Sequence, residues 1–282
     1  MRKWCHSGGV TAASDVDLRD HIDGVGAILA GTANVIIQLS LAPVGYGVVE
    51  SKVESGQIMR HPLKRFRTTF SFLAVAMLGD EDDRVAIRKA IDTAHRHVRS
   101  DASSPVKYNA FDPDLQLWVA AAIFWGAEDV MIKLRGPLDP QLRDVHYEHG
   151  ARFATTLQVK PDMWPVDRDA FDEYWEQMIP RLHIDDTVRD YLQRLVDYAF
   201  MPKPFRLAMG PLHRLLTIGF LPPFWREQMQ ATWTEADQRR FDRVVGTVAA
   251  INRRMPRIVR NFPFNFYLWD VRRRVRTGQR IV

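Results

Sequence analysis

Residues 24–49, GVGAILAGTANVIIQLSLAPVGYGVV, carry no charged side chain, and this run limits what the chain can fold into. A helix of this length could cross a bilayer. Polar and helix-bending residues interrupt the run, however, at Thr32, Asn34, Gln38, Ser40 and Pro43. We therefore favour a helix that is buried inside a globular protein over one inserted in a membrane. The glycines and alanines predict close packing against another backbone or a flat ligand.

Signals for helix starts and stops recur along the rest of the chain. Asp112-Pro113 and Asp139-Pro140 place a capping side chain before a proline that suits the first helical turn. Thr234 and Asp237 form a capping-box pattern, and Gly79 and Gly136 stand where helices should stop. The predicted helices span residues 16–42, 62–78, 82–99, 113–134, 140–158, 168–180, 186–199, 206–219, 223–231 and 235–254, and helical conformation can resume after Pro263.

Alternating strand patterns joined by hairpin turns are missing, so we predict an all-α fold. With 282 residues and breaks that look like corners rather than flexible linkers, the chain is predicted to form a single large helical bundle. Residues 1–15 are expected to be a loose N-terminal segment. Residues 271–282 form a basic tail, in which five arginines occur without an acidic residue. A solvated helix end is the favoured interpretation of this tail, and the alternative is peripheral contact with anionic membrane headgroups.

Other sequence features narrow the partners and the compartment. The single cysteine, Cys5, excludes an intrachain disulfide and fits a reducing compartment. No apolar stretch near the N-terminus resembles a secretory signal, so a cytoplasmic protein is expected, with membrane association as an alternative. Basic and aromatic residues do not interleave as they do on nucleic-acid platforms, so no nucleic-acid partner is predicted.

The stretch TAHRHVRS (93–100) raises the question of an interior histidine. His95 follows Ile91 by four residues and precedes Val98 by three, so it lies at the edge of the apolar stripe of its helix. His97 lies farther round, toward solvent. An inward histidine is more often a hydrogen-bonded core residue than a metal ligand, and the pattern alone leaves both interpretations open.

The preceding helix contains Arg65 and Thr69, which are four residues apart and lie beside the apolar face formed by Phe66, Phe70, Leu73 and Met77. An arginine carried toward the interior needs an anion or several acceptors, because burying an unpaired charge is costly. A carboxylate of the chain would suffice. A bound propionate or a reduced oxygen species would serve equally well.

Three segments, HPLKRFRTT (61–69), AHRHVRS (94–100) and YNAFDPDLQLWV (108–119), together resemble the rubber oxygenase family. This family includes the latex-clearing proteins and the fungal oxygenase of mycophenolic acid biosynthesis. The likeness extends from about residue 24 to the C-terminus and includes LPPFWREQM and RRMPRIVR. It implies an all-helical fold that binds haem b, with His95 of an H-x-x-V stretch as the ligand of the iron. Arg65 and Thr69 match an arginine and a threonine near the haem.

The same resemblance implies a haem-dependent oxygenase, of dioxygenase or peroxygenase type, that uses dioxygen and acts on an apolar unsaturated substrate such as an isoprenoid or a lipid. Arg65 and Thr69 would stabilise charge on oxygen, and Glu50 or Glu54 would act as a base. Thr68 stands where latex-clearing members often have a lysine, which puts rubber as the substrate in doubt. The alternatives are a non-catalytic protein that binds haem or a hydrophobic small molecule, and a scaffold that has lost haem.

Several nearby motifs have structural explanations. Tyr108, Asp112 and Trp118 match a family segment, but we interpret Asp112 as a helix cap and Trp118 as a core residue. The segment VAAAIF (119–124) is apolar where relatives often have a histidine. The stretch HYEH (146–149) lacks the spacing of a zinc hydrolase motif and is predicted to form a solvated face. The aromatic cluster FPFNFYLW (262–269) fits either a lipid-like pocket or ordinary packing.

Overall fold

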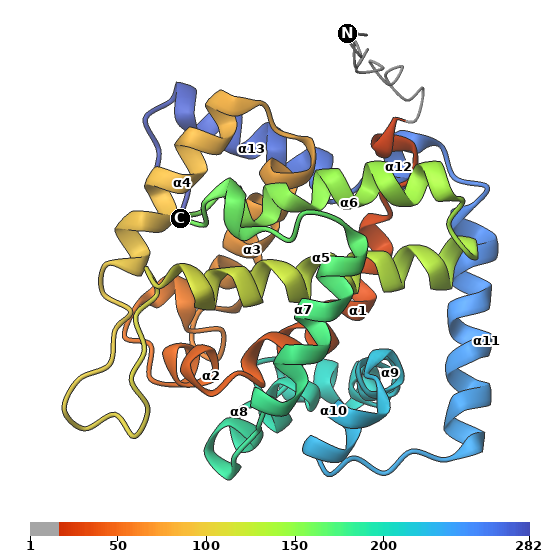
Figure 1. Cartoon of the computed structure of the whole chain (residues 1–282). Coiled ribbons are helices and arrows are strands. Elements are labelled where there is room, and N and C mark those ends of the chain that lie inside the picture. The colour runs from red at the N-terminus through yellow and green to blue at the C-terminus, as the bar shows by residue number, and fades with distance from the viewer. Residues whose placement is uncertain (1–16) are drawn as a thin grey trace, which may run out of the picture.

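The computed structural model describes residues 17–282, and the regular secondary structure of these residues is helical (Figure 1). The α-helices are α1 Gly24–Leu39, α2 Ala42–Val49, α3 Pro62–Leu78, α4 Glu81–His95, α5 Pro113–Arg135, α6 Pro140–Thr155, α7 Arg168–Met178, α8 Asp186–Val196, α9 Lys203–Phe220, α10 Pro223–Gln228, α11 Glu235–Asn252, α12 Arg257–Arg260 and α13 Phe264–Arg276. Short 3-10 turns are η1 Leu18–Asp20, η2 Glu54–Gly56, η3 Pro161–Met163 and η4 Ile179–Arg181.

The predicted all-α fold is confirmed. Within residues 17–282, the only β-type pairing is an isolated antiparallel bridge between Arg99 and Asn109. The expected loose segment 1–15, with Cys5, lies outside the described residues.

The uncharged run 24–49 folds as two helices, α1 and α2, which are bent by 113° at the break between them. α1 packs on the central helix α5, and Ile36 and Ile37 are almost completely buried. The polar side chains that interrupted the run find partners there. The Asn34 amide donates to the Ala122 carbonyl at 2.6 Å, and the Gln38 amide donates to Asn34 at 2.6 Å. These bonds remove the cost of burying amides, so the run forms core rather than surface.

Among the described helices, only α5 is by itself long and apolar enough to cross a membrane. The most apolar stretch of this helix is 61% buried by the rest of the molecule. The pair α1 and α2 meets the same length and composition only when the two bent helices are counted together.

The helix caps that the sequence predicted are present. The Asp112 carboxylate accepts hydrogen bonds from the backbone N–H groups of Asp114 and Leu115, at the start of α5. Asp139 caps α6 in the same way through the N–H of Leu142, and Thr234 and Asp237 form a reciprocal capping box at α11. Each cap satisfies N–H groups that the first helical turn leaves unpaired.

Some predicted helix boundaries are wrong by several residues. The helix expected over residues 16–42 begins only at Gly24, and the one expected over 82–99 ends at His95. After His95 the chain turns away so that Arg99 can pair with Asn109. α9, expected from residue 206, begins at Lys203, because Pro204 suits a first helical turn.

A cluster of tryptophans lies between α5, α7 and α10. The ring of Trp175 stacks on Trp125, with centroids 5.3 Å apart, and on Trp118, with centroids 5.2 Å apart. Trp225 adds a third contact to Trp175 at 5.9 Å. Trp118 is fully buried and donates its indole N–H to the Gln38 carbonyl, which confirms its predicted place in the core.

The solvated face predicted for HYEH (146–149) is wrong. His146 is only 6% exposed and stacks on Phe124, with ring centroids 5.0 Å apart. A nitrogen of His149 forms a 2.8 Å hydrogen bond with the Met77 carbonyl. α6 packs closely on α5 because Gly150 has no side chain, and a Cβ at this position would lie 2.4 Å from the Phe124 ring. The sequence pattern of charged neighbours did not reveal this contact.

Candidate functional site

Two neighbouring helices position the predicted site residues. α3 carries Arg65 and Thr69 in its first turns, and α4 ends at His95. The Asp80–Asp83 capping box fixes the start of α4, and Ile87 and Ile91 bury its apolar stripe. Because α3 and α4 pack against each other, the inward histidine of one helix lies close to the arginine of the other.

His95 faces inward as the helical spacing predicted, while His97 is exposed. The Nδ1 atom of His95 is buried and has no hydrogen-bond partner within residues 17–282. The His95 and Phe111 rings lie edge to face, with centroids 6.4 Å apart. Burial, and secondly the positive charge of Arg65, lower the pKa of His95 to about 4. The imidazole is therefore neutral at neutral pH, which is the form that binds a metal.

Arg65 forms no ion pair with any residue from 17 to 282, and its guanidinium donates no hydrogen bond within that range. Desolvation lowers the pKa of Arg65, although the Tyr191 phenol of α8 has the opposite effect. The side chain nevertheless remains partly accessible. The guanidinium of Arg65 therefore lacks a counter-charge within residues 17–282.

Thr69 lies one turn after Arg65 and is half-buried. The neighbouring Thr68 is buried, and its hydroxyl donates to the Lys64 carbonyl at 2.9 Å. Thr68, the residue that replaces the lysine of latex-clearing members, thus bonds to the backbone of its own helix.

The two candidate bases differ in their surroundings. Oε2 of Glu50 accepts hydrogen bonds from the hydroxyl of Tyr108 at 2.8 Å and from that of Ser104 at 2.7 Å. Burial, and secondly the bond to Glu50, raise the pKa of Tyr108 to about 12. Glu54 is exposed and forms a 3.0 Å ion pair with Lys64, so its carboxylate belongs to the outer surface.

The structure thus brings His95 and Arg65 together, with Thr69 one turn farther along α3. It ties Glu50 to the loop between α4 and α5 through Tyr108. Sequence reasoning missed Tyr191, which lies near Arg65, and Phe111, which contacts His95. Phe111 lies within the segment YNAFDPDLQLWV (108–119), whereas Tyr191 belongs to α8, an amphipathic helix whose sequence carries no functional signal.

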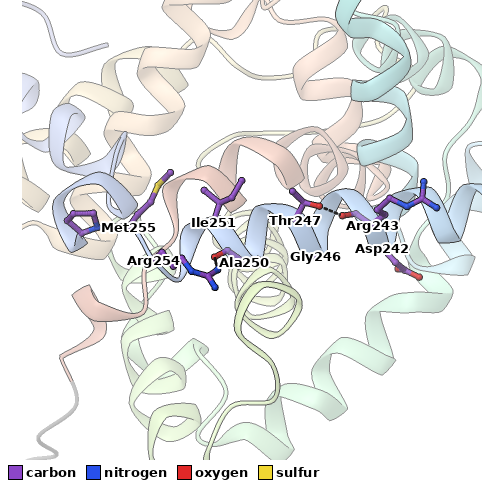
Figure 2. A pocket seen from close by; sticks show the side chains of 9 residues that line it. Asp242, Arg243, Gly246, Thr247, Ala250, Ile251, Arg254 and Met255 are labelled. Atoms are coloured by element: carbon purple, nitrogen blue, oxygen red, sulfur yellow. Dashed lines mark hydrogen bonds between the residues drawn. The ribbon is translucent and has the colours of Figure 1, made fainter.

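Two grooves in the described part of the molecule lie away from these residues. The larger, of about 700 Å³, runs along α11 and is lined by Ala250, Ile251 and Met255, with charged residues at its rim (Figure 2). The other, of about 480 Å³, lies between Trp125, Phe220 and Phe241. Neither contains the pairing of a neutral imidazole with a free cation. We therefore place the candidate site at His95 and Arg65.

Comparison with known proteins identifies the family of the chain. Residues 18–250 match the model of the ER-bound oxygenase mpaB/B'/rubber oxygenase catalytic domain. The chain is 49% identical over 255 residues to the proteins Mb2261 of Mycobacterium bovis and Rv2237 of Mycobacterium tuberculosis, both described as uncharacterized. Each comparison covers 90% of this chain and 100% of the relative. No solved structure matches the chain significantly.

The family model spans most of the helical bundle, from η1 to α11, and includes α3 and α4 with their inward arginine and histidine. The chain therefore belongs to the family of mpaB-type and rubber oxygenase catalytic domains.

Proposed function

We propose that this protein is a haem-dependent oxygenase whose iron ligand is His95. The convergence of a neutral, inward imidazole with an unpaired guanidinium is the observation that carries the proposal. A ligand histidine must have a free nitrogen lone pair, and the lowered pKa of His95 keeps the ring unprotonated throughout the neutral range.

The residues around His95 fit a haem. Neither ring nitrogen of His95 has a hydrogen-bond partner within residues 17–282. Arg65, for its part, lacks the carboxylate that would neutralise it, and a haem propionate would supply one. When bound, haem b would provide the position at which dioxygen binds and is activated.

The other side chains have supporting roles in this proposal. Arg65 would hold a carboxylate of the cofactor or pair with an anionic oxygen species, and Thr69 would donate its hydroxyl to the same group. Glu50 remains a predicted base. Its Oε2 accepts hydrogen bonds from the hydroxyls of Ser104 and Tyr108.

We propose an apolar, unsaturated substrate of isoprenoid or lipid type. Thr68 bonds to the Lys64 carbonyl and cannot replace a lysine amine, which argues against the chemistry of the rubber-cleaving members.

The decisive measurement is the absorption spectrum of the protein after expression with ample haem or after reconstitution. We expect a Soret band that is lost in His95→Ala. The variant His97→Ala is the matched control, because it removes an exposed imidazole two residues away, and it should keep the band. A colourless wild-type protein, or equal spectra for the two variants, would refute the haem proposal.

Catalysis requires a second measurement on the coloured protein. Oxygen consumption with an isoprenoid alcohol or a polyunsaturated fatty acid should exceed the rate without substrate. This difference should fall at least tenfold in Thr69→Val, while the Soret band persists. A coloured protein that consumes no oxygen with either substrate would be a haem carrier, which is the alternative function.

A further inference from the structure

The positive charge of the chain is concentrated at its C-terminal end. Residues 243–282 contain ten arginines and a single acidic residue, Asp270. The net charge of the whole chain is only +5, so residues 1–242 carry a net negative charge. Such asymmetry is typical of proteins that contact a polyanionic partner or surface.

The same segment exposes several large apolar side chains. Besides Val275 near the end of α13, five large apolar side chains of α12, α13 and the turn between them face solvent: Ile258 (72% exposed), Val259 (46%), Phe262 (53%), Phe266 (45%) and Trp269 (52%). We call this set the α12–α13 strip. Phe266 lies 6.3 Å from Phe262 and 5.8 Å from Trp269, measured between ring centroids, so the aromatic part of the strip is continuous.

The acidic groups near the strip are already neutralised. Asp270 is buried and paired with Arg273 and Arg274. Asp17 and Asp20 pair with Arg257. The strip therefore presents no free carboxylate among residues 17–282.

Unpaired arginines precede and follow the strip along the chain. Within residues 17–282, no ion pair involves the exposed arginines of this segment at Arg253, Arg254, Arg276 and Arg280. The Arg273 guanidinium lies 5.7 Å from the centre of the Trp269 ring, so its charge stands directly beside the aromatic surface.

We propose that the α12–α13 strip is an interfacial binding surface for bilayers that contain anionic lipids. Aromatic rings flanked by arginines suit the boundary of a membrane, where the rings enter the interface and the cations meet the phosphate groups. The arginine excess is the complement of a negatively charged bilayer. A second copy of the same strip would bring like charges together, so charge complementarity favours the bilayer over self-association.

This surface lies one helix away from the candidate site. α13 packs along α3, where the Tyr267 ring stacks on Phe70, with centroids 5.8 Å apart, and Phe264 contacts the same ring. α3 carries Arg65 and Thr69. Binding of the strip to a bilayer would therefore place α3 close to the membrane. An apolar substrate dissolved in the bilayer would then lie near Arg65 and Thr69. This last consequence rests on the proposed function, whereas the membrane binding does not.

Vesicle flotation tests the proposal on the full chain without any cofactor. We expect binding to phosphatidylcholine vesicles that contain phosphatidylglycerol, and much weaker binding to pure phosphatidylcholine vesicles. Phe262→Ser/Phe266→Ser/Trp269→Ser should reduce the affinity at least tenfold. Arg254→Gln and Arg276→Gln should each reduce it by about fivefold, and high salt should weaken the binding of the wild type.

Matched variants elsewhere serve as controls. Phe205→Ser/Leu207→Ser/Met209→Ser removes three similarly exposed apolar side chains from α9, and Arg239→Gln/Arg240→Gln removes two exposed charges from the far end of α11. Both should bind vesicles like the wild type, and circular dichroism should show that every variant is folded.

Any of four results would overturn the proposal. The first three are a wild type that does not float with anionic vesicles, a strip variant that floats as well as the wild type, and an α9 control that loses binding. The fourth is evidence that the strip mediates another contact, either a dimer that becomes monomeric in the strip variant or binding to duplex nucleic acid without vesicle binding.

Discussion

Two charged or titratable side chains determine the character of the candidate site. His95 is held neutral by burial and by the nearby guanidinium, and Arg65 is enclosed without a carboxylate partner. Without a bound ligand, the buried unpaired Nδ1 of His95 and the unpaired guanidinium of Arg65 each cost folding free energy. Such costs are typical of residues that are positioned for a ligand rather than for the stability of the fold.

At this scale we predict that Arg65→Met stabilises the haem-free protein against urea by roughly 1–2 kcal/mol, because it removes an unpaired cation from the interior. The same variant should release haem faster than the wild type when an apoprotein acceptor is added. Arg60→Met, which changes an exposed arginine on the same segment, should shift the stability by less than about 0.5 kcal/mol. A haem-free Arg65→Met protein that is less stable than the wild type would show that Arg65 has a structural role.

At the scale of elements, the fold depends on how closely α1 approaches α5. Gly126 of α5 faces Asn34 of α1, and a Cβ at this glycine would lie 2.2 Å from the Asn34 amide nitrogen. That amide donates to the Ala122 carbonyl, so the close approach and the polar contact depend on each other. Gly246 of α11, in contrast, has no atom within 4 Å of the place that a Cβ would occupy.

These two glycines provide a matched pair of substitutions. Gly126→Ala should destabilise the protein by about 1–3 kcal/mol, because the added methyl group displaces the Asn34 amide from the Ala122 carbonyl. Gly246→Ala should stabilise it by roughly 0.5–1 kcal/mol, through the better helix propensity of alanine. Chemical denaturation measures both changes. Equal effects of the two substitutions would contradict the packing described here.

At the scale of the whole molecule, stability is linked to pH through two inward histidines. Burial lowers the pKa of His146 to about 4, with His149, Arg168 and His21 adding positive charge around it. Burial and Arg65 lower the pKa of His95 to a similar value. Each folded-state pKa lies below the ordinary value of 6.5, so the unfolded chain binds more protons between about pH 6.5 and pH 4. Stability is therefore lost as the pH falls through this window.

We expect each histidine to contribute roughly 2 kcal/mol to the loss of unfolding free energy between pH 7 and pH 5. His146→Phe should remove part of this loss, because phenylalanine does not titrate and still stacks on Phe124. His97→Asn changes an exposed ring and should leave the pH dependence unchanged. Urea titrations at a series of pH values test this prediction, which fails if His146→Phe and the wild type lose the same free energy.

The amino-acid sequence by itself determined the helical class, most helix limits and the orientation of several site residues. Helical spacing was enough to turn His95 inward and to place Arg65 beside Thr69, because these relations depend only on the geometry of one helix. His97 is exposed as expected, although it lies in the turn after α4. Local hydrogen bonds likewise fixed the caps at Asp112 and Asp139.

Only the tertiary structure decided which helices meet. It bent the uncharged run into α1 and α2, buried His146 against Phe124, brought Tyr191 near Arg65 and joined Glu50 to Tyr108. The physical reason is that these contacts join residues far apart in the chain, or on different helices. They depend on crossing angles and loop paths, which are set by the packing of the whole core and which no local periodicity encodes.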